Sequence, residues 1–457
     1  MVRSYGIMHL DRWSEWVVWS GSVGARNSLN SANRAVERTW KMPTLFGLLT
    51  TACARLKHAI RSAVGDRAAS PGRTTQSPPV PSPAVAPIAA DLGVIRMAVA
   101  NELERKMKPS ATPIPNGNGQ SQGGEVERER LRMMLLIRRF EEKTYVEYAN
   151  PRRMPDGSTE MKIGGFCHLY SGQEAIAVGI AAVFKKGIDA LVNGYRCHGH
   201  SLALGMKPRD AMAELFGKAT GCSKGKGGSM HFFDAEVGNH GGHGIVGGHI
   251  PLGLGFAFSQ KYKKNGGVTY CLFGDGAVNQ GTFNEALNMA SLLKVPAIFM
   301  VENNGVAMGT TVARHSAEQD LAKRGLGYNM PCENVDGNDV DAVIAAMTKA
   351  GDRGRRGEGP TFYSVNTFRF RGHSMSDPLK YRSKEEAEKA KLRDPITLYA
   401  DKLRGRGFIT EEQIEAMEAE VSSEVDQAIQ QAEADPNPGL EERFDDILAE
   451  TYPYQPK

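Results

Sequence analysis

The chain has 457 residues, 41% of them hydrophobic, and its 56 basic and 52 acidic residues give a formal net charge of +4. A chain of this length can bury at least one large core, and the usual size of domains allows two or three. The near balance of charge gives no reason to expect a nucleic acid or a membrane as partner. No run of about eighteen apolar residues occurs, so a membrane span is not expected.

The first part of the chain differs in composition from the rest. Residues 66–87 are rich in Pro, Ser and Ala, and residues 113–124 form a second stretch of flexible composition. All four tryptophans lie in the first forty residues: Trp13, Trp16, Trp19 and Trp40. We therefore predict an N-terminal extension over residues 1–124 and one folded domain with a helical tail over residues 125–457.

The extension is basic, which is typical of organelle transit peptides. We prefer a divergent or wrongly assigned start to a transit peptide, because the segment is long and shows no clean cleavage site. Six cysteines are scattered without a C-x-x-C pair: Cys53, Cys167, Cys197, Cys222, Cys271 and Cys332. This pattern favours a reducing compartment. The expected location is a bacterial cytoplasm, or the mitochondrial matrix if the extension is a transit peptide.

Helical and strand-like segments alternate along the folded part. An amphipathic helix is expected over 131–150, where apolar residues recur at three- and four-residue spacing. The later elements are strands at 268–273, 296–301 and 362–367, a helix at 282–293, and charged tail helices at 383–402 and 411–434. Such alternation predicts the α/β class, with a parallel sheet flanked by helices and right-handed crossovers.

Two polar groups follow neighbouring strands of this predicted sheet. Asp275 follows the first strand within Gly-Asp-Gly, and Asn304 follows the second within Glu-Asn-Asn. Because parallel strands end at the same edge of a sheet, both side chains should emerge side by side where open α/β folds bind ligands. One carboxylate and one amide oxygen are hard donors, which suit magnesium that takes further ligands from a diphosphate.

The tripeptide alone is a weak signal, since acidic turns with glycine are common. The whole arrangement of strand, G-D-G, helix, strand and N-N resembles the thiamine diphosphate enzymes, which implies thiamine diphosphate and Mg²⁺ as cofactors. The resemblance makes Asp275, Asn304 and the backbone carbonyl of Val306 the magnesium ligands, with Gly276 and Ala277 beside the cofactor. Relatives often carry Tyr where this chain has Val306. A backbone carbonyl ligand tolerates this change, but the chain lacks the tyrosine ring of those relatives.

Further stretches between about Arg138 and Ile396 resemble the alpha chains of heterotetrameric 2-oxo acid dehydrogenases. His168, within residues 165–175, matches the substrate-facing histidine of that family. Tyr195 and Arg196 begin the next matching stretch, in which the arginine binds diphosphate. Arginine suits this role because its planar fork donates two parallel hydrogen bonds to phosphate oxygens.

Two more segments extend the resemblance. Residues 244–248 are similar to the segment that meets the aminopyrimidine of the cofactor, which makes Gly244 and Val246 binding positions. Residues 371–378 closely resemble the active-site loop of pyruvate dehydrogenase alpha chains, with His373 as its catalytic histidine. Branched-chain 2-oxo acid and acetoin dehydrogenases usually differ in this loop, so pyruvate is the preferred substrate. Ser374 matches a phosphorylation site of animal relatives, and its phosphorylation here is a hypothesis.

Some features of the sequence suggest other functions. Residues 225–231 are not a nucleotide P-loop, because the glycine spacing is too short and Gly227 follows Lys226. Seven of the eleven histidines lie between His168 and His249, which would fit a metal hydrolase, but no H-E-x-x-H occurs. A catalytically silent scaffold and a generic nucleotide-binding protein remain as non-enzymatic alternatives.

The resemblance implies oxidative decarboxylation of a 2-oxo acid and transfer of the acyl group to a lipoyl group. In this family a separate beta chain supplies the carboxylate that faces the aminopyrimidine. The expected assembly is therefore an α₂β₂ tetramer docked on a lipoyl-bearing dihydrolipoyl acetyltransferase, and the chain alone is expected to be inactive.

Overall fold

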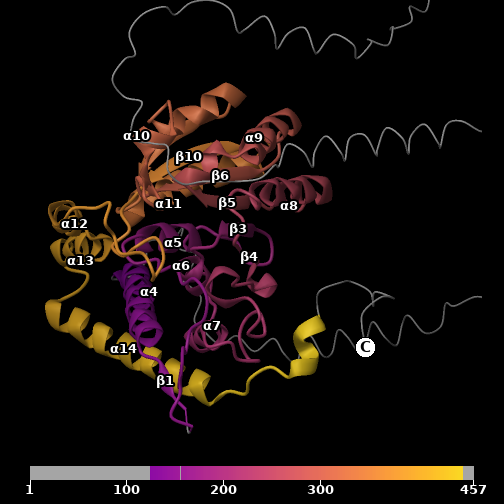
Figure 1. Cartoon of the computed structure of the whole chain (residues 1–457). Helices are drawn as coiled ribbons and strands as arrows, with labels where there is room; N and C mark the ends of the chain where they lie inside the picture. Colours follow the sequence, from indigo (N-terminus) through magenta and orange to yellow (C-terminus); the bar gives the residue numbers. More distant parts are fainter. Residues whose placement is uncertain (1–123, 155, 446–457) are drawn as a thin grey trace, which may run out of the picture. The chain divides into compact units, whose positions relative to one another are not determined.

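The computed structural model describes residues 124–154 and 156–445 (Figure 1). Nearly all of the predicted extension, with its tryptophans and Cys53, lies outside these residues, and the domain boundary at 124/125 stays a prediction. No helix of the described residues is long and apolar enough to cross a membrane.

A six-stranded sheet forms the centre of the fold, and every neighbouring pair of its strands is parallel. The spatial order is β4 (Asn239–His243), β3 (Ala190–Gly194), β5 (Thr269–Gly274), β6 (Ala297–Asn303), β10 (Thr361–Asn366) and β9 (Cys332–Asp336). Parallel sheets are covered by helices on both faces, and their central strands are accordingly apolar throughout. The predicted α/β class with a parallel sheet is confirmed.

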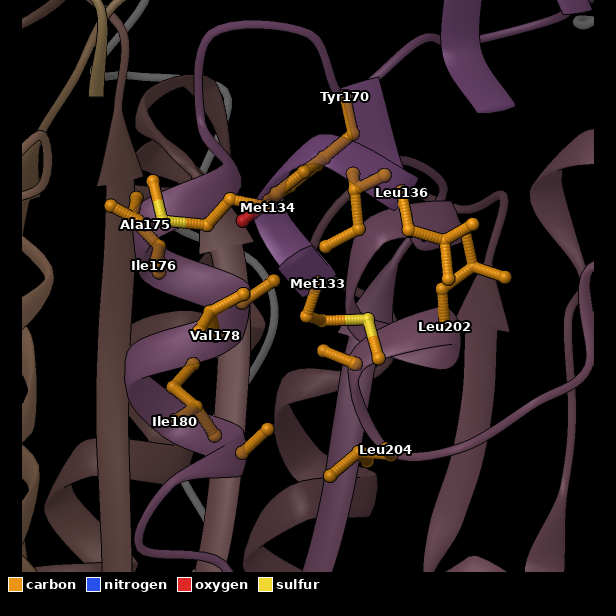
Figure 2. Packing of buried hydrophobic residues seen from close by; sticks show 14 of the residues in the cluster. Met133, Met134, Leu136, Tyr170, Ala175, Ile176, Val178, Ile180, Leu202 and Leu204 are labelled. Carbon is orange, nitrogen blue, oxygen red and sulfur yellow. The ribbon is translucent and has the colours of Figure 1, made fainter. Parts of the chain in front are cut away.

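Alternate residues of β5 belong to two separate cores. Tyr270 and Leu272 pack into a cluster with helices α4 (Glu125–Ala149), α5 (Glu174–Ala181) and α11 (Val340–Arg355). Cys271 and Phe273 pack into the other cluster, with α8 (Ile250–Lys263) and α9 (Gly281–Leu293). Because side chains alternate across a strand, one apolar run supplies both faces of the sheet. Figure 2 shows part of the first cluster.

The remaining helices are α6 (His198–Ala203), α7 (Pro208–Leu215), α10 (Val312–His315), α12 (Lys384–Lys391), α13 (Pro395–Gly405) and α14 (Glu411–Ala434). Short two-stranded ladders pair β1 (Arg152–Arg153) with β2 (Thr159–Glu160) and β7 (Val306–Ala307) with β8 (Thr310–Thr311).

The predicted strands, the 282–293 helix and the 411–434 helix are confirmed within a few residues. The entry helix begins at Glu125, six residues earlier than predicted. The single helix predicted over 383–402 is wrong, because α12 ends at Lys391 and α13 begins at Pro395. Proline has no N–H to donate within a helix, and Asp394 caps the new start by accepting a hydrogen bond from the N–H of Ile396.

A substitution on helix α4 tests the packing of the first core most directly. Phe140 is fully buried on this helix, so Phe140→Ala should lower the free energy of unfolding by about 3–5 kcal/mol through lost burial and a new cavity. Val146 on the same helix is 45% exposed, and Val146→Ala should change it by less than about 0.5 kcal/mol. Urea denaturation of the full chain measures both values. Equal effects would show that α4 is not packed as described.

Candidate active site

A cavity of about 290 Å³ opens at the carboxyl ends of β3, β5 and β6. Nine of the eleven predicted site residues line it: Tyr195, Arg196, Val246, Asp275, Gly276, Ala277, Asn304, Val306 and His373. His168 does not line the cavity, but its ring centroid is 4.5 Å from that of Tyr195 and 5.2 Å from that of His373, and both of these residues do. Gly244 is not in the cavity wall. It lies instead against the ring of His231.

The oxygen donors lie at one corner of the cavity. Asp275 begins a 3-10 turn after β5 and is 2% exposed. Burial raises the pKa of its carboxyl group, since the charged form loses water, and the hydrogen bond from His315 and the charge of Arg369 offset this only in part. Asn304 and Val306 flank Gly305, whose φ of +83° is a conformation that glycine adopts without strain. Gly276 is also constrained, because a Cβ there would lie 2.8 Å from the Cβ of Ala307.

A chain of polar side chains orients the Asp275 carboxylate. Arg324 donates to Oδ1 of Asn279 (2.9 Å), which fixes the amide so that its NH₂ group faces Nδ1 of His315 (3.0 Å). The imidazole Nδ1 is then the acceptor, and Nε2–H donates to Asp275 Oδ2 (3.2 Å). No motif in the sequence pointed to His315.

Two buried guanidinium groups face the same cavity. Arg196 is 7% exposed and donates to the backbone carbonyls of Leu169 (2.6 Å) and His373 (2.8 Å). Arg369 is 1% exposed and donates to the carbonyl of Arg371 and the hydroxyl of Tyr381.

Neither guanidinium forms an ion pair with a carboxylate among the described residues. Burial and then the neighbouring Arg369 lower the pKa of Arg196 to about 10. A buried cation without an anionic partner is costly, so this wall is complementary to an anion such as a diphosphate. Sequence reasoning missed Arg369, although its place just after β10 puts it at the same sheet edge as Asp275.

The two candidate catalytic histidines are neutral near pH 7. Burial, and then the positive charge of Arg196, lower the pKa of His168 to about 2 and that of His373 to about 4. His168 is 5% exposed, and its Nδ1 atom has no hydrogen-bond partner among the described residues. Nearby, Ser374 is almost buried, and its hydroxyl lies 3.0 Å from that of Ser376.

The backbone of the glycine-rich segment 225–231 binds a carboxylate of the chain itself. The buried carboxylate of Glu214 accepts hydrogen bonds from the backbone N–H groups of Ser223, Gly225, Gly227 and Gly228 at 2.7–2.9 Å. These are the groups that a phosphate would need, so this segment is not a phosphate-binding loop.

The histidines between His168 and His249 do not form a metal centre. Within the described part of the chain, no group of three or more His, Cys, Asp or Glu side chains is arranged to hold a metal ion. His249 donates from Nε2 to the carbonyl of Leu272 (2.7 Å), and Nε2 of His243 is 3.2 Å from the carbonyl of His240. Asp275 lines the cavity together with Asn304 and Val306, so one carboxylate lies in the same wall as residues that offer amide and backbone oxygens.

The low pKa of His373 predicts a pH dependence of stability. Between pH 6.5 and about 4 the unfolded chain binds a proton at this residue and the folded chain does not, so stability falls as the pH is lowered. His373→Gln should make this decline shallower, as measured by urea denaturation of the cofactor-free chain from pH 7 to pH 4. An unchanged slope would contradict the neutral, desolvated imidazole described above.

Comparison with known proteins agrees with this geometry. Residues 132–441 match the family model described as dehydrogenase E1 component. A protein of Rhizobium meliloti named pyruvate dehydrogenase E1 component subunit alpha is 48% identical over 318 residues, covering 69% of this chain and 88% of the relative. The protein of the same name from Zymomonas mobilis is 46% identical over 322 residues, covering 70% and 88%. A mitochondrial type II form from Ascaris suum is 44% identical over 313 residues, covering 67% and 79%. The chain belongs to the dehydrogenase E1 component family.

Proposed function

We propose that the chain is the alpha subunit of a pyruvate dehydrogenase, which decarboxylates pyruvate and transfers the acetyl group to a lipoyl group. The observation that carries this proposal is one cavity lined both by the oxygen donors Asp275 and Asn304 and by the buried cations Arg196 and Arg369, which form no ion pair with a described carboxylate. The names of the relatives support pyruvate over branched-chain 2-oxo acids and acetoin.

Membership of the dehydrogenase E1 component family implies thiamine diphosphate as cofactor. When bound, thiamine diphosphate supplies a carbon nucleophile and an electron sink for decarboxylation. We assign its diphosphate to the guanidinium groups of Arg196 and Arg369 and to the turn at Gly276 and Ala277. The assignment is supported by the burial of both cations without a carboxylate partner.

Mg²⁺ is proposed to bind to the carboxylate of Asp275, the amide oxygen of Asn304 and the carbonyl of Val306. Magnesium prefers such hard oxygen ligands and completes its shell with water and phosphate oxygens. The raised pKa of the buried Asp275 carboxyl supports this, because a bound cation would compensate the desolvated charge.

His168 and His373 are proposed to contact the substrate. Being neutral, each imidazole offers one N–H donor and one acceptor nitrogen, which suits it to hold or deliver a proton at the carbonyl oxygen of a 2-oxo acid. Arg196 links both segments, since it donates to the carbonyls of Leu169 and His373. Nδ1 of His168 is buried and has no hydrogen-bond partner among the described residues, so a ligand that reached it would satisfy it.

A beta subunit is proposed to cover the cavity and to supply the carboxylate that faces the aminopyrimidine. Exposed apolar side chains at Ile245, Val246 and Met308, beside or in the cavity wall, support such a cover. An α₂β₂ tetramer on a lipoyl-bearing acetyltransferase follows as the proposed assembly. We also propose residues 125–457 as its folded domain and, from its bacterial relatives, a cytoplasmic location.

The function is tested with the chain co-expressed with its candidate beta subunit. Pyruvate-dependent reduction of a dye acceptor should require both thiamine diphosphate and Mg²⁺. Asp275→Ala should lower kcat/KM by about 100-fold or more, because it removes a charged metal ligand. The exposed Asp352 on α11 provides a matched control, and Asp352→Ala should leave turnover unchanged.

Two results would contradict the proposal. Faster turnover of branched-chain 2-oxo acids or acetoin than of pyruvate would move the enzyme to a sister group. No cofactor-dependent turnover of any of these substrates, with a verified beta subunit present, would favour a catalytically silent scaffold.

A further inference from the structure

The glycine-rich segment 225–231 places one hydroxyl group against the backbone of His168. Ser229 lies on the short 3-10 helix Gly228–Met230, and its Oγ accepts a hydrogen bond from the N–H of His168 (3.1 Å). The segment is held in place by the carboxylate of Glu214, which binds the N–H groups of Gly227 and Gly228. Ser229 is 3% exposed, so this contact is shielded from water.

A fully buried pair of ionisable groups holds Ser229 from the other side. Glu141 on α4 and His198 on α6 are both 0% exposed. Nδ1 of His198 lies 3.1 and 3.0 Å from the two carboxylate oxygens of Glu141, and Nε2 lies 2.9 Å from Oγ and 3.1 Å from the carbonyl oxygen of Ser229. Nδ1–H can therefore donate to Glu141 while Nε2 lies within hydrogen-bond distance of the Ser229 hydroxyl, and the ring is stacked on Phe232 with centroids 4.7 Å apart.

Together with Arg196, these groups hold the backbone of residues 168–170. The N–H of His168 is bound by Ser229, the carbonyl of Leu169 by Arg196, and the N–H of Tyr170 by Glu141 (2.9 Å). By contrast, Nδ1 of the His168 ring has no partner among the described residues. The ring is thus directed by its backbone and packing, and its hydrogen-bonding capacity at Nδ1 is not used within the described residues.

We propose that Glu141, His198 and Ser229 are positioning residues that aim the imidazole of His168 at the substrate. The inference rests on the proposed role of His168 and extends it to three residues that do not line the cavity. A buried polar pair is weak support for stability, because desolvation offsets much of its attraction. It does, however, fix geometry, and small displacements of a reacting group cost on the order of 100-fold in rate.

A double-mutant cycle separates positioning from a general structural role. Ser229→Ala removes the acceptor of the His168 N–H and should lower kcat by about 10- to 100-fold, with little change in the affinity for thiamine diphosphate. In the His168→Ala background the same change should have less than about a twofold effect, because no imidazole remains to be positioned. The enzyme is assayed as the co-expressed complex, with lipoyl-dependent turnover and cofactor titration as readouts.

Ser364 supplies the control. It is also fully buried, but it lies on β10 and its hydroxyl bonds only to Asn366 among the described residues, so Ser364→Ala should leave kcat unchanged. Glu141→Gln tests the same network with a nearly isosteric side chain, and its effect should also vanish in the His168→Ala background. This variant keeps the test decisive if Ser229→Ala does not fold.

The possible failures are distinguishable. Equal losses of kcat from Ser229→Ala with and without the His168 side chain would overturn the positioning role and leave the proposed function intact. Full activity of His168→Ala would overturn both the proposed role of His168 and this inference. Coupled, non-additive losses would support it.

Discussion

Parallel pairing of β5 with β6 is the constraint on which the candidate active site depends. Gly274 at the end of β5 is in register with Glu302 near the end of β6. Asp275 follows the first strand directly and Asn304 follows the second, so both oxygen donors reach the same corner of the cavity. An antiparallel pairing would separate them by the length of the strands. The backbone register of this βαβ unit thus brings the two proposed metal ligands to the same end of the sheet.

Buried charge without an internal partner distinguishes this cavity from the rest of the fold. Two other buried carboxylates form ion pairs within the described chain, Asp189 with Arg355 and Glu174 with Arg138. Arg196 and Arg369 instead donate to carbonyl and hydroxyl oxygens, and among the described residues the Asp275 carboxylate accepts a side-chain hydrogen bond from His315 alone. Isolated charges are costly in a protein interior. Cations for a diphosphate and a carboxylate for a metal are complementary to the proposed cofactors, which accounts for this imbalance.

The sequence was sufficient to predict the α/β class, the central strands and nine residues of the cavity wall, because local apolar runs and short motifs carry that information. It did not predict β3 and β4, which are short, and β4 consists of Asn, His and Gly. Contacts between distant segments were also missed. Glu141 and His198 are 57 positions apart, and no sequence motif near either residue predicts their contact. His315 reaches the site from the short helix α10, whose place depends on tertiary packing, as does the departure of Gly244 from the cavity wall.

Anomalous scattering from a crystal of the complex with the beta subunit, thiamine diphosphate and Mn²⁺ in place of Mg²⁺ tests the central claim most directly. The account predicts one Mn²⁺ peak in the cavity, about 2.1 Å from oxygens of Asp275, Asn304 and Val306. A peak among the histidines between His240 and His249 would contradict it. So would a bound cofactor with no metal between Asp275 and Asn304.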